Sequence, residues 1–264
     1  MKNIWYEYVY GKQTYKELAQ KYDCSPKTIQ RYLKKHQLNQ CIKLPRDVVL
    51  LIDTTYWRRT FGVMVFKDAE SGETLLRYYV KYETNSLYLK GINELIMQGF
   101  RILAVVCDGR KGLAGKLKPL PIQLCQFHQI STITRYLSKH PKHQSGKDLK
   151  LIVGLIPEIT QMQLEDFLEQ WLDIWKDYYN ERGVEPDSGQ SFYIHRRLRS
   201  AFRSLRTNIA LLFTYQKYPS LKIPNTTNKL DGSFAYLKQR LGCHNGLSTL
   251  QMKKFIDDIL GVSK

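Results

Sequence analysis

The pattern of apolar and polar positions divides the chain into a short helical segment, a group of strands and a long helical segment. In the first segment, Ile29 and Leu33 lie four residues apart, as on the inner face of a helix. Ser25 and Pro26 precede them as a typical helix start, because Ser caps free N–H groups and Pro fits the first helical position. Earlier helices are expected over 3–10 and 14–22, so residues 1–40 are predicted to form a small all-α helix-turn-helix domain.

A linker over residues 36–46, which lacks a clear period, separates this domain from the group of strands. The apolar runs that follow are short and rich in β-branched residues, as in buried strands. Strands are expected over 48–53, 60–66, 75–82, 102–108 and 122–127. A helix over 86–98, ended by Gly99, falls between the third and the fourth strand. Three strands, a helix and further strands are typical of the mixed α/β sheet of RNase H-like domains.

The third segment, from Ile130 onward, is almost entirely helical in pattern. Helices are expected over 149–159, 163–179, 192–218 and 228–241, the last of these being the final helix, with loops over 140–146 and 181–190. The helices at about 130–221 would interrupt the sheet domain. We therefore expect an RNase H-like domain over residues 47–264 that carries a helical insertion.

The charge of the chain indicates a polyanionic partner. Its 264 residues include 41 Lys and Arg against 24 Asp and Glu, for a net charge of +17 and a pI near 9.6. Basic side chains that neutralise phosphates release counterions, so an excess of this size favours nucleic acid. An anionic membrane is disfavoured because no apolar run approaches the ~20 residues of a spanning helix. The five scattered cysteines, Cys41 among them, contain no C-x-x-C pair and indicate a reduced, cytoplasmic compartment.

Two aspartates follow buried apolar runs. Asp53 comes after Val-Val-Leu-Leu-Ile, and Asp108 comes after Leu-Ala-Val-Val-Cys. On adjacent strands their carboxylates would lie within reach of one ion, and Mg²⁺ prefers such oxygen ligands. Either residue alone could instead cap a turn. A third carboxylate, Asp231, falls in the first turn of the helix over 228–241, where the helix dipole also favours an acid.

Four motifs together resemble bacterial insertion-sequence transposases of the DDE class that are related to Mutator-like elements. The matching segments are 51–57 (LIDTTYW), 106–112 (VCDGRKG), 124–129 (LCQFHQ), and 225–234 (NTTNKLDGSF) with 237–240 (LKQR). The resemblance implies that Asp53, Asp108 and Asp231 are catalytic and bind Mg²⁺, for which Mn²⁺ can substitute. It places Cys125 and His128 in a C-x-x-H motif and the helical insertion before the third acid. That acid is usually Glu, so Asp231 is one methylene shorter.

Cys125 and His128 also look like half of a zinc site, but no second pair completes it. We expect them to be a packed pair on the fifth strand, with His128 near the DNA. Base or phosphate contacts are expected from three groups. These are the outward face of the helix that begins at Ser25 (Lys27, Thr28, Gln30 and Arg31), an arginine stripe (Arg196, Arg199, Arg203 and Arg206), and Lys238 with Arg240.

The sequence therefore predicts a transposase that hydrolyses a phosphodiester at the ends of an insertion sequence and transfers the freed strand to target DNA. Its partners would be double-stranded DNA and further copies of itself, without a membrane, at the nucleoid in the bacterial cytoplasm. The alternative is a non-catalytic DNA-binding regulator derived from a decayed or truncated transposase. A junction resolvase of RNase H type is a third interpretation, but a basic helical insertion of ~90 residues is uncommon without a function.

Overall fold

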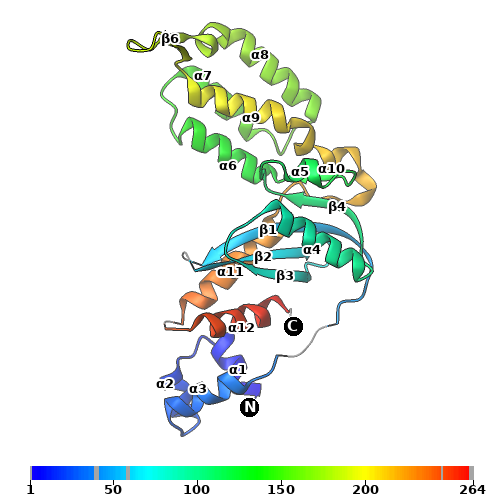
Figure 1. The fold of residues 1–264 in the computed structure, drawn as a ribbon, viewed down its shortest axis with the longest axis vertical. Helices are drawn as coiled ribbons and strands as arrows, with labels where there is room; N and C mark the ends of the chain where they lie inside the picture. Colours follow the sequence, from blue (N-terminus) through cyan, green and yellow to red (C-terminus); the bar gives the residue numbers. More distant parts are fainter. Residues whose placement is uncertain (1, 39–41, 58–59, 245, 262–264) are drawn as a thin grey trace.

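The computed structural model of the chain describes residues 2–38, 42–57, 60–244 and 246–261. Cys41 and part of the predicted linker lie outside the described residues. The protein is elongated, with three N-terminal helices at one end, a sheet in the middle and an arm of helices at the other end (Figure 1). None of the described helices combines the length and the apolar character that crossing a bilayer requires.

Five strands form the central sheet in the order β3-β2-β1-β4-β5. Their bounds are β1 Asp47–Trp57, β2 Phe61–Asp68, β3 Thr74–Val80, β4 Arg101–Cys107 and β5 Ile122–Leu124. The first three strands are antiparallel, and β4 and β5 run parallel to β1. This strand order and these directions are those of an RNase H-like sheet, which confirms the predicted fold class.

Helices cover both faces of the sheet, which explains why the central strands are continuously apolar rather than alternating. On one face, Ile52 and Phe66 pack beneath α4 (Asn85–Met97), with the short α5 (Leu113–Lys116) nearby. The approach of α4 is close, because a Cβ on Gly91 would lie 2.1 Å from the Phe66 ring. On the other face, Leu51 and Val65 belong to an apolar cluster that includes α11 (Asn228–Gly242) and α12 (Thr249–Leu260).

The insertion forms the helical arm seen beyond the sheet in Figure 1. It comprises α6 (Gln126–Leu137), α7 (Gln144–Gly154), α8 (Gln161–Asn180), α9 (Arg196–Leu212), α10 (Thr214–Lys217) and the 3-10 turn Pro219–Leu221. Three predictions were wrong here. The helix expected over 192–218 begins only at Arg196, because residues 191–193 form a strand, and it ends at Leu212. The helix expected over 149–159 begins at Gln144, where the His143 side chain accepts the N–H of Ser145. The expected loop 181–190 is bounded by the strands of a hairpin, β6 (Arg182–Val184) and β7 (Ser191–Tyr193).

The helix over 228–241 is not the last one, because α12 follows it. Ser248 and Gln251 start α12 with a reciprocal capping box, a motif that can be recognised in the sequence. The N-terminal helices pack against α12; they are α1 (Lys2–Val9), α2 (Tyr15–Lys21) and α3 (Pro26–Lys35). Lys254 donates to the carbonyl oxygens of Leu33 and Lys34 at the end of α3. The three N-terminal helices thus share one apolar cluster with α11 and α12.

Candidate active site

The two aspartates after apolar runs lie side by side on neighbouring parallel strands. Leu51 of β1 is in register with Val106 of β4, so Asp53 and Asp108 both come two residues further on. Asp108 directly follows the last residue of β4. The predicted strand over 48–53 would end at Asp53, but in the structure Asp53 lies inside strand β1. Strand β1 continues to Trp57 because it goes on pairing with β2 beyond the point where its pairing with β4 stops.

Asp53 is held in an environment that disfavours its charge. Burial, and then the nearby carboxylates of Asp108 and Asp231, raise its pKa to about 7, against the opposing effects of the Thr54 N–H and of His128. The Thr54 N–H donates to Asp53 Oδ1 at 2.7 Å. Within the described part of the chain, no Lys, Arg or His nitrogen lies within 4.0 Å of these three carboxylates. The negative charge of the group is therefore left without a protein counter-ion at contact distance.

Helix α11 brings the third acid to the sheet. Asp231 lies in the first turn of α11, four residues after the N-cap residue Thr227. The Thr227 hydroxyl donates to Asp231 Oδ2 at 3.0 Å. Asp231, Asp53 and His128 each offer one ligand atom, and these three atoms lie within 4.8 Å of one another. The shorter acid thus reaches the neighbourhood of Asp53, and His128 joins it there, whereas Asp108 lies outside this set of three.

The C-x-x-H motif is placed differently from our expectation. Strand β5 ends at Leu124, so Cys125 is the N-cap residue of α6 and His128 lies in the first turn of that helix. Cys125 Sγ accepts both the N–H and the hydroxyl of Thr227, each at 3.3 Å. His128 Nδ1 lies 3.4 Å from the same hydroxyl. One buried threonine therefore joins the start of α6 to the start of α11.

The surroundings of this motif shift both of its groups toward their charged forms. Burial acts to raise the pKa of the Cys125 thiol, but hydrogen bonds from His128 and Thr227 outweigh it and lower the pKa. The hydrogen bond to Cys125, against the effect of burial, raises the pKa of His128 to about 9, and the charges of Asp53 and Asp231 add to this. The sequence indicated His128 as a ligand only in half of a zinc site with Cys125, not beside the carboxylates, and Thr227 was not identified as the residue between the motifs. The i, i+3 spacing of Cys125 and His128 at a helix start was the available signal.

The donor set fits a divalent cation. Carboxylates from the end of β4 and from α11 lie near enough to Asp53 of β1 to act on its charge, and hard cations such as Mg²⁺ prefer such oxygen ligands. A cation there would offset the burial and the carboxylate repulsion that together raise the pKa of Asp53. The imidazole of His128 is within 4.8 Å and would be a ligand that Mn²⁺ accepts more readily than Mg²⁺ does, but only after it gives up the proton that its raised pKa retains.

The residues expected to read DNA lie on the outer surface of α3, with one exception. Lys27, Gln30 and Arg31 are exposed. Thr28 is half-buried, and its hydroxyl is 3.0 Å from Ser25 Oγ and accepts from Arg31 Nη2 at 3.4 Å. Lys27, Gln30 and Arg31 are therefore the members of this face that are open to a ligand.

Part of the arginine stripe on α9 has a structural use. Arg199 stacks on Tyr193, with its Cζ 3.4 Å from the ring centroid, and donates to the Tyr179 carbonyl oxygen. Arg206 Nη1 lies 3.6 Å from a carboxylate oxygen of Glu169. Arg196 and Arg203 remain exposed. On α11, Lys238 is exposed, whereas Arg240 donates to the Tyr10 carbonyl oxygen of the N-terminal helices.

Comparisons with known proteins add little beyond the fold. No protein-family model and no curated protein matches the chain. Among solved structures, the dimeric HTLV-2 integrase catalytic core domain in complex with magnesium is similar at 15% identity and a TM-score of 0.26, over 58% of this chain and 98% of that one. Its trimeric form gives 18% identity and a TM-score of 0.23, over 59% and 98% of the two chains. A simian T-cell lymphotropic virus intasome in complex with PP2A regulatory subunit B56 gamma gives 12% identity and a TM-score of 0.26, over 74% of each chain.

Proposed function

We propose that this protein is a DNA transposase of the DDE class, of the bacterial insertion-sequence type related to Mutator-like elements. The observation that carries the proposal is the group of carboxylates at Asp53, Asp108 and Asp231 on an RNase H-like sheet. None of them has a basic partner within 4.0 Å in the described structure. A buried carboxylate whose pKa is raised by burial and by neighbouring acids, as that of Asp53 is, is a recurrent property of catalytic metal sites.

In this proposal Asp53, Asp108 and Asp231 would hold Mg²⁺, with Mn²⁺ as an active substitute. Bound divalent metal supplies an activated water for phosphodiester hydrolysis and neutralises charge on the leaving oxygen. Thr227 positions the third acid, because its hydroxyl fixes one carboxylate oxygen of Asp231. His128, which its raised pKa keeps protonated at neutral pH, places a positive charge beside Asp53 and Asp231.

The proposed substrates are the double-stranded ends of the element and a target duplex. Lys27, Gln30 and Arg31 on α3 would contact the element ends, as a recognition helix does in the major groove. Arg196 and Arg203 on α9, and Lys238 on α11, are exposed and would bind phosphates. The site of action would be the bacterial nucleoid, with more than one copy in the DNA complex.

The test uses a plasmid that carries the reading frame with its natural flanking DNA. We expect the purified protein to cut at the element ends in Mg²⁺ or Mn²⁺ and not in EDTA. Asp53→Asn and Asp108→Asn should abolish cutting. Asp47→Asn is the matched control, because Asp47 begins the same strand as Asp53 and is exposed in a weak pair with Arg101. If the parent protein binds DNA but does not cut it under any of these conditions, the proposal is contradicted and the regulator alternative is supported.

The third acid has its own prediction. Asp231→Asn should abolish cutting, whereas Asp231→Glu should retain or increase it, because the longer carboxylate extends into the same space from the first turn of α11. Cutting by Asp231→Asn at the parental rate would mean that the third ligand lies elsewhere. Glu165 on α8 and Glu185 beside β6 are poor substitutes, because α8 and β6 lie in the helical arm away from the sheet (Figure 1).

A further inference from the structure

A network of hydrogen bonds lies beside Asp53 and Asp108, and a further acid stands at its centre. This acid is Glu83, in the segment that leads from β3 to α4. Both of its carboxylate oxygens face donors, because the Tyr88 hydroxyl donates to Oε1 at 2.8 Å and Arg110 Nη1 lies 3.4 Å from Oε2. The side chain of Glu83 is only 18% exposed, so it is engaged with the protein rather than open to a ligand.

One branch of the network leads to Asp53. The Tyr88 hydroxyl is 2.9 Å from Thr54 Oγ1. A phenol has a single O–H, and Tyr88 gives it to Glu83, so the Thr54 hydroxyl donates to Tyr88. The N–H of the same threonine donates to Asp53 Oδ1 at 2.7 Å. Tyr88 is 1% exposed, so water cannot replace a hydrogen bond that is lost there.

The other branch leads to Asp108. The main-chain N–H of Arg110 donates to Asp108 Oδ1 at 3.2 Å. The guanidinium of Arg110 is anchored away from that carboxylate, because Nε donates to Asn85 Oδ1 at 2.7 Å and Nη2 donates to the Glu83 carbonyl oxygen at 2.8 Å. Asn85 in turn donates to the Lys111 carbonyl oxygen at 3.0 Å. The turn that follows β4 is thereby tied to the start of α4 through two adjacent residues.

The extension of β1 beyond Asp53 contributes to the same network. The hydroxyl oxygen of Tyr56, three residues further along β1, accepts the N–H of Glu83 at 2.8 Å. Burial raises the pKa of the Glu83 carboxyl, and the nearby charge of Asp108 acts in the same direction. The segment that carries Glu83 is therefore held by β1, by α4 and by the turn after β4, close to both aspartates.

We propose that Glu83 is a positioning residue that fixes the spacing of Asp53 and Asp108. It acts through Tyr88 toward the first aspartate and through Arg110 toward the second. Carboxylates that bind a metal depend on such outer contacts, whose removal commonly weakens metal binding by about 10–100-fold. This inference rests on the proposed function, because the two aspartates would hold the divalent metal.

Two variants distinguish position from charge. Glu83→Asp keeps the charge, but the shorter side chain cannot reach both Tyr88 and Arg110, so we expect the Kd for Mn²⁺ to rise about 10-fold. Arg110→Gln removes a positive charge near the carboxylates, which by charge alone would tighten cation binding. Because the turn after β4 loses its anchor, we expect a Kd about 10-fold higher instead. EPR titration of the full-length, metal-free protein measures the Kd, and circular dichroism checks folding.

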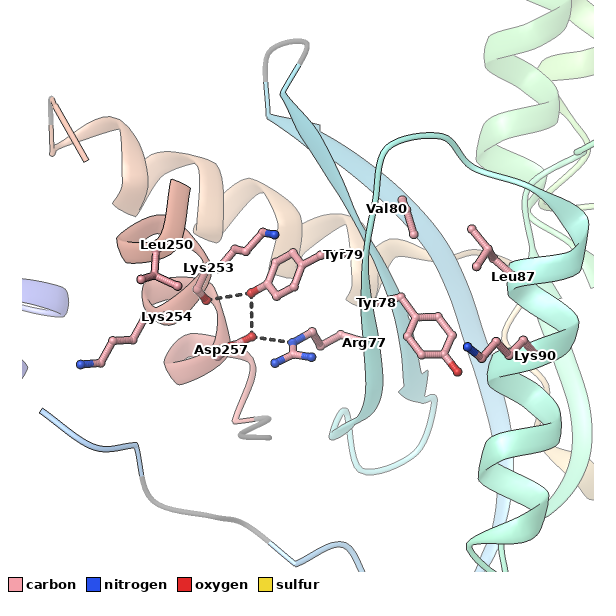
Figure 2. A pocket seen from close by; sticks show the side chains of 10 residues that line it. All are labelled: Arg77, Tyr78, Tyr79, Val80, Leu87, Lys90, Leu250, Lys253, Lys254 and Asp257. Atoms are coloured by element: carbon pink, nitrogen blue, oxygen red, sulfur yellow. Dashed lines mark hydrogen bonds and ion pairs between the residues drawn. The ribbon is translucent and has the colours of Figure 1, made fainter. Parts of the chain in front are cut away.

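Tyr88→Phe interrupts the branch to Asp53 without changing any charge, and it should also raise the Kd for Mn²⁺ about 10-fold. Tyr78→Phe is the matched control, because the Tyr78 hydroxyl likewise donates to a carboxylate of α4, that of Glu94. Figure 2 shows Tyr78 on the α4 side of β3, beside Lys90. Since β3 lies two strands from β1 in the sheet, Tyr78→Phe should bind Mn²⁺ within about twofold of the parent.

Hydrogen exchange provides a measurement that needs no metal. In the metal-free protein, Glu83→Asp and Arg110→Gln should each speed exchange of the peptide over residues 108–112 by about fivefold or more, because the turn after β4 is released. Exchange of the same peptide in Tyr78→Phe should equal that of the parent.

The positioning role is overturned by a Kd for Mn²⁺ within about twofold of the parent in Glu83→Asp or Tyr88→Phe, or by tighter binding in Arg110→Gln. A parent that binds no Mn²⁺ would instead contradict the proposed function. In that case hydrogen exchange decides alone, and unchanged exchange over residues 108–112 in Glu83→Asp and Arg110→Gln would overturn the positioning role as well.

Discussion

Replacing Asp53 by Asn should stabilise the metal-free protein while it destroys the proposed site. Burial and the nearby carboxylates raise the pKa of Asp53 from 3.8 to about 7. At about 1.4 kcal/mol per tenfold change in proton affinity, ionised Asp53 costs the fold at most about 4 kcal/mol. Asn keeps the oxygen that accepts the Thr54 N–H at 2.7 Å and carries no charge. We therefore expect a gain of about 2 kcal/mol, half of that upper bound.

The gain should depend on pH with a defined sign. Because the folded state binds the Asp53 proton more tightly than the unfolded state does, this residue lowers stability as pH rises from about 4 to about 7. Above that window the cost is complete, and below it both states are protonated. The advantage of Asp53→Asn over the parent should therefore be largest at pH 8 and shrink as the pH is lowered toward 5.

Thermal unfolding in EDTA at pH 8 measures the effect. At about 2–4 °C per kcal/mol for a chain of this size, Asp53→Asn should melt roughly 4–8 °C higher than the parent. Asp47→Asn, exposed at the start of the same strand, should melt within about 2 °C of it. Mg²⁺ should then raise the melting temperature of the parent and leave Asp53→Asn unchanged. A lower melting temperature for Asp53→Asn in EDTA would refute the electrostatic reasoning.

Three further predictions follow from named contacts. Thr227→Val removes the hydroxyl that donates to Asp231, so Mn²⁺ affinity measured by EPR should fall about 10-fold; equal affinity would deny Thr227 a positioning role. Gln30→Ala or Arg31→Ala should weaken binding to the element ends by ~1–3 kcal/mol in gel-shift titrations, and an equal loss on random DNA would make these residues phosphate contacts. Gly91→Ala puts a Cβ 2.1 Å from the buried Phe66 ring, so urea denaturation should show a loss of ~1–3 kcal/mol; unchanged stability would mean that α4 shifts freely.

Local signals in the sequence predicted much of the sheet and of the first helices. The Ser25 cap and Pro26 start α3 as expected, because caps and first-turn prolines act within one turn. The apolar runs located β1 and β4 because a strand buried on both faces must be continuously apolar. The candidate acids followed from these runs, since Asp53 and Asp108 come at the same distance along two parallel strands.

What the sequence did not reveal depends on contacts between distant segments. Strand β1 passes beyond Asp53 because β2 goes on pairing with it, which no local pattern records. The β6–β7 hairpin has strands of three residues, and Tyr193 in it is packed under Arg199 of the following helix. Thr227 lies about a hundred residues from Cys125, so their contact could be found only in three dimensions.

Helix α11 spans the distance between the N-terminal helices and the carboxylates. Asp231 lies in its first turn, and Arg240 in its last turn is hydrogen-bonded to the Tyr10 carbonyl oxygen. Nine residues of helix separate the two contacts, or about 14 Å at 1.5 Å per residue. A helix of this length tilts as one rigid body, so a shift of the N-terminal helices, such as the proposed DNA contacts of α3 would cause, would change the angle at which Asp231 meets Asp53. The position of the N-terminal helices and the placement of Asp231 are therefore linked through a single element.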